Sequence, residues 1–188
     1  MNPKAITLTE KMGFKDPDLT TPEHDKMILW LLDENNLSKV ITTIFPDLRI
    51  YYVDRKNDDE KISETHFYDA NKIIPKVTYN LKTEHVVLNT YNRFIIGFID
   101  IKFTVSSYFR DDLDKLLFIN FEKYTKTSSS EISFLIEVKP EIRSFGEVVR
   151  QIETYKTYEK GIYIIVTKKT QFKPYFEQNG IYVYEMEP

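Results

Sequence analysis

The spacing of apolar residues along this chain predicts both helices and strands. Apolar positions three and four residues apart predict a helix through residues 27–32, a second short helix at 37–44 and a longer helix that begins after Ser144. A further short helix is predicted at residues 174–179, where Gly180 ends it. Continuous or alternating apolar runs predict strands at residues 48–53, 76–81, 85–89, 94–105, 116–122, 132–139, 161–167 and 181–184.

Polar residues mark where two of the helices begin. Ser144 and Glu147 have the spacing of a capping box ahead of the longer helix. At the first helix, Thr20 and Glu23 have the same spacing. Alternatively, the next residue, Thr21, is the N-cap, and the proline that follows it occupies the first helical position.

The remaining segments are predicted to be loops or linkers. Residues 54–61 are charged and predict a solvated hairpin tip, and residues 125–130 predict a polar linker. Proline and glycine punctuate residues 1–20, which predicts a weakly ordered arm. We expect residues 21–188 to form a single domain.

The composition fits a small intracellular protein. The chain has 188 residues, a length that favours one domain with a sizeable core. It contains no cysteine, which excludes a disulfide framework, a thiolate metal site and thiol catalysis. No apolar stretch resembles a signal peptide or a membrane span, so we expect a cytoplasmic location, or the host cytoplasm for a viral protein, and no membrane partner. Abundant isoleucine, tyrosine and lysine with only two alanines are typical of AT-rich genomes, such as viral or archaeal ones.

Three ionisable residues lie among apolar neighbours in predicted strands. Glu137 and Lys139 are two residues apart, so their side chains share one face of a strand whose other face is apolar. Asp100 lies in an earlier apolar strand. Burying such groups costs free energy unless they are paired or bind a ligand. Two acids and a lysine on adjacent strands therefore predict a magnesium site with a cation beside it.

Three short motifs, in this order, resemble the PD-(D/E)xK nuclease superfamily. They are Gly97-Phe-Ile-Asp100 in a strand, Glu137-Val-Lys139 at the end of a strand, and Gln151-Ile-Glu-Thr-Tyr155 on the next helix. The helical motif is most similar to the RecB-like and Cas4-like branch, and the resemblance covers roughly the second half of the chain. The absence of cysteine excludes the iron–sulfur cluster of the Cas4-like proteins. The resemblance implies an α/β fold with a restriction-endonuclease-like αβββαβ core, in which helices flank a mixed central sheet.

The activity implied by the resemblance is that of a metal-dependent DNA nuclease, which hydrolyses phosphodiester bonds. The carboxylates of Asp100 and Glu137 suit Mg²⁺ or Mn²⁺. The resemblance adds the backbone carbonyl of Val138 as a further metal ligand. Lys139 would orient the attacking water, lower its pKa or neutralise the charge that develops on the phosphate.

Residues of two helices complete the implied site. The resemblance assigns Gln151 to the metal-bound water or the DNA, with Tyr155 one turn away to support it or to stack. Glu23 matches the family's N-terminal helical acid in position, although it is equally suited to capping the helix. His24, next to Glu23, either assists the metal site or is a surface residue of the first helical turn.

Each assignment has a structural alternative. Asp100 and Lys139 could form an ion pair between strands with Glu137 in solvent, and Gln151 could be an ordinary residue of the helix surface. Lys102 shares a strand face with Asp100 and is either a DNA contact or a solvated or strand-paired lysine. For the protein as a whole, the alternatives are a catalytically silent member of the fold that binds nucleic acid or protein, and an unrelated α/β interaction module.

The expected partners follow from the charge and the edge strands. At a net charge of −3, the chain needs a local basic surface or metal ions to meet DNA. A small acidic protein that holds a long polyanion would gain from a second copy, and the apolar residues 116–119 could pair across a sheet edge. These features suggest a homodimer on DNA.

Overall fold

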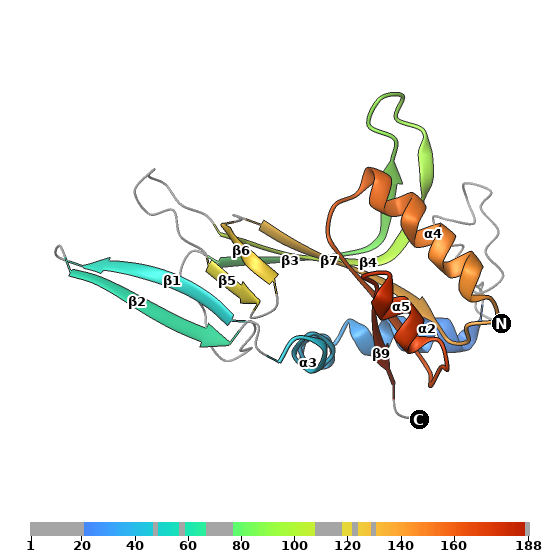
Figure 1. Ribbon diagram of the computed structural model, residues 1–188, viewed down its shortest axis with the longest axis horizontal. Coiled ribbons are helices and arrows are strands. Elements are labelled where there is room, and N and C mark those ends of the chain that lie inside the picture. Colours follow the sequence, from blue (N-terminus) through green and yellow to red (C-terminus); the bar gives the residue numbers. More distant parts are fainter. Residues whose placement is uncertain are drawn as a thin grey trace, which may run out of the picture. The chain divides into compact units, whose positions relative to one another are not determined.

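The protein is an α/β protein whose main element is a five-stranded mixed sheet (Figure 1). The structure, a computed structural model, describes residues 21–46, 49–56, 59–66, 77–107, 118–121, 124–128 and 131–186. Its helices are α2 (Pro22–Leu31), α3 (Glu34–Ile44), α4 (Phe145–Tyr158) and α5 (Lys173–Gln178). Its strands are β1 (Arg49–Lys56), β2 (Asp59–His66), β3 (Val77–Leu88), β4 (Ile95–Ser107), β5 (Phe118–Phe121), β6 (Tyr124–Ser128), β7 (Glu131–Lys139), β8 (Ile162–Thr167) and β9 (Tyr182–Glu185). The predicted arm at residues 1–20 lies outside the described residues.

The chain divides into two compact units, which are described separately. The first unit comprises residues 1–30, 81–103 and 133–188, and the second comprises residues 31–80 and 104–132. All candidate site residues named above belong to the first unit. The single domain expected over residues 21–188 stays a prediction. None of the described helices is long and apolar enough to cross a membrane.

The five-stranded sheet has the order β3-β4-β7-β8-β9. Strands β7, β8 and β9 are parallel; the register of β7 and β8 runs from Phe134↔Ile162 to Lys139↔Thr167. Strands β3 and β4 are neighbours joined by a short turn, so they run antiparallel and the sheet is mixed. The predicted α/β class is therefore confirmed.

The core of the first unit lies between this sheet and the helices α4 and α5. Helix α4 buries Val148, Ile152 and Tyr155, which recur at spacings of four and three residues and so form one helix face. They pack against residues of the strands, among them Ile99, Leu135 and Ile165, in one apolar cluster. The helix begins as predicted, because the hydroxyl of Ser144 accepts a hydrogen bond from the backbone N–H of Glu147.

The second unit contains an antiparallel sheet with the order β2-β1-β5-β6, and it corrects two predictions. The loop predicted at residues 54–61 is largely strand, since β1 continues to Lys56 and β2 begins at Asp59. Residues 125–128 of the predicted linker are also strand, because β6 ends only at Ser128. Backbone pairing with a neighbouring strand thus extends strands into polar sequence.

The strand expected to offer a dimer edge is not an edge strand. Strand β5 pairs with β1 on one side and with β6 on the other. Its described residues, Phe118–Phe121, therefore have no open backbone edge for a second copy. That argument for a homodimer is wrong, and the dimer itself stays an untested prediction.

A partly buried polar cluster connects the end of α4 to β3 and β4. The Nζ of Lys102 lies 2.6 Å from Oε1 of Glu159, and the Nε2 of His85 lies 3.4 Å from Oε2 of Glu159. Lys102 is thus paired within the fold. Burial raises the pKa of Glu159, but Lys102 and His85 outweigh this and hold it below the usual value. Burial also lowers the pKa of His85.

This cluster predicts a loss of stability in acid. Both pKa values lie below those of the unfolded chain, so stability should fall as the pH drops below about 6.5 for His85 and below about 4.3 for Glu159. Glu159→Gln should therefore destabilise the protein by about 1 kcal/mol at neutral pH and by less at an acidic pH below the lowered pKa of Glu159, where the wild-type carboxylate is protonated as well. Urea unfolding at both pH values measures this, with the exposed Glu177→Gln as control. An equal loss at both pH values would contradict it.

Candidate active site

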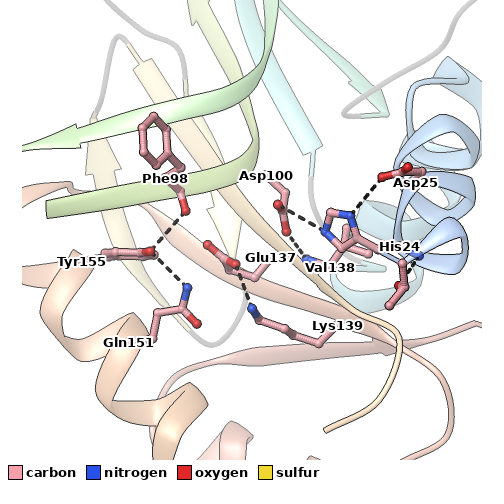
Figure 2. Close-up of polar contacts among 10 residues, drawn as sticks. His24, Asp25, Phe98, Asp100, Glu137, Val138, Lys139, Gln151 and Tyr155 are labelled. Carbon is pink, nitrogen blue, oxygen red and sulfur yellow. Dashed lines mark hydrogen bonds and ion pairs between the residues drawn. The ribbon is translucent and has the colours of Figure 1, made fainter. Parts of the chain in front are cut away.

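The side chain of Asp100 is bonded to the strand that carries Glu137 and Lys139. Asp100 lies on β4, and its Oδ2 accepts a hydrogen bond of 2.7 Å from the backbone N–H of Val138 on β7 (Figure 2). This nitrogen belongs to the peptide bond between Glu137 and Val138. Asp100 is 7% exposed and Glu137 is 2% exposed. The structure thus brings the two predicted acids together on adjacent, buried strands.

Lys139 is buried beside Glu137. Its Nζ lies 3.9 Å from Oε2 of Glu137, and the two residues share one face of β7 as predicted from their spacing. Burial of one charged group costs several kcal/mol, and attraction to an oppositely charged partner nearby can offset a cost of that order. The alternative that leaves Glu137 in solvent is wrong, because its side chain is buried next to an ammonium.

Helix α4 adds Gln151 and Tyr155 to the same region. The Nε2 of Gln151 donates a hydrogen bond of 3.0 Å to the hydroxyl of Tyr155, and this hydroxyl donates one of 3.2 Å to the carbonyl of Phe98 on β4. Figure 2 shows this chain of contacts beside Glu137 and Lys139. Gln151 is half-buried, so it is not an ordinary surface residue of the helix. Tyr155 thereby fixes the position of the Gln151 amide.

Gly97 makes room for Tyr155 against β4. A Cβ atom at position 97 would lie only 2.5 Å from the hydroxyl oxygen of Tyr155, closer than real Cβ atoms come to other heavy atoms. Burial and, next, the charge of Glu137 raise the pKa of Tyr155 to about 12. The phenol therefore stays protonated near neutral pH and keeps a hydrogen to donate to Phe98.

His24 also belongs to the site. The sequence alone had not decided between this position and one on the surface. Its Nε2 lies 3.4 Å from Oδ1 of Asp100, and its Nδ1 lies 3.6 Å from Oδ1 of Asp25. These distances exceed those of good hydrogen bonds, so the contacts are mainly electrostatic. Burial lowers the pKa of His24, but the charges of Asp100 and Asp25 outweigh burial and raise it overall. The alternative of a surface histidine is wrong, since His24 is 4% exposed.

The helix geometry explains why His24 is buried. The backbone N–H of His24 donates a hydrogen bond of 3.2 Å to the hydroxyl of Thr21, which supports the Thr21 alternative for the helix start. His24, Met27 and Leu31 are spaced by three and four residues, and all three are buried. They therefore share one face of α2. This spacing was the signal in the sequence that could have placed His24 inside.

Glu23 points to a different partner. Its side chain is about half exposed, and its carboxylate forms an ion pair with the ammonium of Lys168. Consecutive helical residues are about 100° apart around the helix axis, so Glu23 and His24 face different directions. The residue of α2 that contacts Asp100 is therefore His24, the neighbour of the one selected from the sequence.

The donors at this site fit a hard divalent cation in chemical type. Asp100 and Glu137 offer carboxylate oxygens, and Val138 offers a backbone carbonyl. Within the described ranges, no three His, Cys, Asp or Glu side chains are already grouped as a metal site. Mg²⁺ usually keeps several waters and needs only one or two protein carboxylates. Two adjacent acids are therefore sufficient donors for it.

Comparison with known proteins gives no match to this chain among protein-family models, curated proteins or solved structures.

Proposed function

We propose that this protein is a metal-dependent DNA nuclease of the PD-(D/E)xK type. The observation that carries the proposal is the hydrogen bond from the backbone N–H of Val138 to Asp100, which ties the carboxylate of Asp100 to the strand that carries Glu137 and Lys139. Buried carboxylates next to a buried ammonium cost stability, and a catalytic role accounts for their retention.

The order of the elements supports a restriction-endonuclease-like core. In the chain, α2, β3, β4, β7, α4 and β8 occur in the order αβββαβ, with α3, β1 and β2 inserted between α2 and β3, and β5 and β6 inserted between β4 and β7. Strands β4, β7 and β8 are neighbours in the sheet. Asp100, Glu137 and Lys139 lie on the first two of these three strands, as the resemblance implies.

The chain's own residues account for most of the chemistry. The side chains of Asp100 and Glu137, with the carbonyl of Val138, would hold Mg²⁺ or Mn²⁺. The bound metal would polarise the phosphate and lower the pKa of a coordinated water. Lys139, whose ammonium lies next to the carboxylate of Glu137, would place this ammonium beside the attacking water or the phosphate. Exclusion of bulk water from these buried groups strengthens each electrostatic contact.

Gln151 is assigned a positioning role through Tyr155. We expect Gln151→Ala to lower kcat by about 10- to 100-fold and to leave a residual rate, because the amide orients and does not bind the metal. Tyr155→Phe should give a similar but smaller loss, since it removes the hydroxyl that holds Gln151. Steady-state cleavage assays with the exposed Gln178→Ala as control measure both effects. Unchanged kcat in Gln151→Ala would contradict the assignment.

The second candidate function is a catalytically silent protein that binds nucleic acid or a protein on the same fold. The observation that favours it is that both carboxylate oxygens of Asp100 already have partners, since one lies near His24 and the other is bonded to Val138. Oxygens with such partners are less available to a metal. A panel of labelled DNA and RNA substrates with and without Mg²⁺ or Mn²⁺ separates the two functions. Metal-dependent cleavage of DNA supports the nuclease, and binding without cleavage supports the silent protein.

A further inference from the structure

A polar cavity opens at the carboxyl ends of β7 and β8. Its volume is about 470 Å³, within the range of about 300–1,000 Å³ that is typical of small-molecule sites. The lining includes Pro140, Ile142, Thr167, Lys169 and Phe172. Ligands of α/β proteins often bind at the carboxyl ends of parallel strands.

The cavity begins where the candidate active site ends. Pro140, in its wall, directly follows Lys139 in the chain. Thr167, also in its wall, is the register partner of Lys139 on β8, so the two side chains lie on the same sheet face. Neighbouring strands are about 4.8 Å apart. A ligand in the cavity would therefore adjoin a phosphate held at Lys139.

Of the described charged side chains that line the cavity, all but one lysine form ion pairs, and the ammonium of that lysine can contact a ligand. Lys168 pairs with Glu23, and Glu141 pairs with Arg143. Lys169 is exposed and has no ion pair within the described part of the chain. Its ammonium can thus bind an anion without breaking an existing contact.

The segment that forms the cavity wall is anchored. The backbone N–H of Thr170 donates a hydrogen bond of 2.7 Å to Oε1 of Glu185, and the backbone N–H of Phe172 donates one to the hydroxyl of Thr170. Phe172 also packs against the ring of Phe145 at a centroid distance of 5.8 Å. An anchored wall of this kind binds a ligand without a large ordering cost.

We propose that this cavity binds the nucleotide that adjoins the scissile phosphate of a DNA strand. Its phosphate would contact Lys169, and its sugar and base would lie against Phe172 and Ile142. The proposal deepens the nuclease function and rests on it. It assigns substrate binding to residues outside the Asp100, Glu137 and Lys139 group.

The test measures DNA affinity separately from cleavage. Anisotropy of a labelled single-stranded oligonucleotide, with EDTA present and over a series of salt concentrations, gives Kd and its salt dependence. The variant is Lys169→Ala, with Lys160→Ala as a control that removes another exposed lysine, beyond the end of α4. Circular dichroism checks that each variant is folded.

We expect Lys169→Ala to weaken binding about 3- to 10-fold and to reduce the salt slope by about 0.7, the value for one phosphate contact on a single strand. Lys160→Ala should change neither quantity. Wild-type affinity and salt slope in Lys169→Ala would overturn the proposal.

The same proteins in a metal-dependent cleavage assay keep the two proposals apart. If the wild type cleaves DNA and Lys169→Ala binds normally, the nucleotide site is wrong and the nuclease stands. If Lys169→Ala loses affinity selectively but the wild type does not cleave, the nuclease is wrong and the binding site stands.

Discussion

Replacing Glu137 with glutamine should lower the rate of metal-dependent DNA cleavage by about a thousandfold or more. The amide keeps the size of the side chain but removes the charge that would hold the cation, and one such electrostatic contribution is typically worth about 10²–10³ in kcat, with the loss of a metal adding to it. Asp100→Asn and Lys139→Met should cause comparable losses. The double variants should lose little more than the single ones, because the three groups act as a unit. Single-turnover cleavage in Mg²⁺ and in Mn²⁺ measures these rates.

The control for this series is Glu177→Gln, an exposed acid of α5. It should cleave at the wild-type rate. Metal affinity separates the roles of the three groups, since loss of either acid should weaken metal binding and loss of Lys139 should not. Glu137→Gln should also lower the free energy of unfolding, because the buried ammonium of Lys139 loses its partner at 3.9 Å. If repulsion between the adjacent acids Asp100 and Glu137 were the main effect, the substitution would instead raise the free energy of unfolding.

Replacing Gly97 with alanine should be the most damaging small substitution for the packing of the site. The new Cβ would lie 2.5 Å from the hydroxyl oxygen and 2.7 Å from Cε1 of Tyr155, and Tyr155 is only 6% exposed. The buried ring must therefore move, at a cost of about 1–3 kcal/mol, as for other overpacked cores. Movement would also break the hydrogen bonds from Gln151 to Tyr155 and from Tyr155 to Phe98. Urea unfolding should show the loss of stability, and a lower kcat should show the loss of the hydrogen bonds that position Gln151.

Gly146→Ala supplies the matched control for this substitution. Gly146 lies in α4, and its new Cβ would make only an ordinary contact of 3.6 Å with Nη1 of Arg150. A glycine-to-alanine change in a helix without a clash usually stabilises by about 0.4–1 kcal/mol. If Gly97→Ala were as stable and active as Gly146→Ala, the close packing of Tyr155 on β4 would be contradicted.

Much of the first unit could be predicted from the sequence because its signals are local. The strand that ends at Lys139 and the strand at residues 161–167 are long apolar runs, and they form β7 and β8. Helix α4 has a capping residue, Ser144, and a regular apolar face. Since side chains alternate along a strand, the shared face of Glu137 and Lys139 also followed from spacing alone.

Other elements depend on contacts that local sequence does not encode. Strand β2 has the sequence Asp-Glu-Lys-Ile-Ser-Glu-Thr-His, which has little apolar character, and it forms by pairing with β1 along its whole length. Strand β3 was predicted as two strands, at 76–81 and 85–89, because the polar residues 82–84 separate them. In the structure it is continuous through Glu84, whose φ of 49° is unusual for a residue other than glycine. Strand propensity depends strongly on neighbouring strands, which explains these errors.

The acid chosen on the first helix was displaced by one residue for a similar reason. The capping alternatives at Thr20 and Thr21 placed the start of the helix to within a residue, but they did not give the direction of each side chain. That direction depends on which face of α2 is buried, and Met27 and Leu31 define that face. A rotation of about 100° per residue then puts His24, and not Glu23, toward Asp100.

The most direct test of the account is cleavage of one labelled DNA by wild type and Glu137→Gln, purified in parallel, with Mn²⁺ and with EDTA. The account predicts cleavage by the wild type in Mn²⁺ alone, and none by Glu137→Gln in either condition. Equal cleavage by the two proteins in Mn²⁺, or no cleavage by a folded wild type with single- or double-stranded DNA, would contradict it.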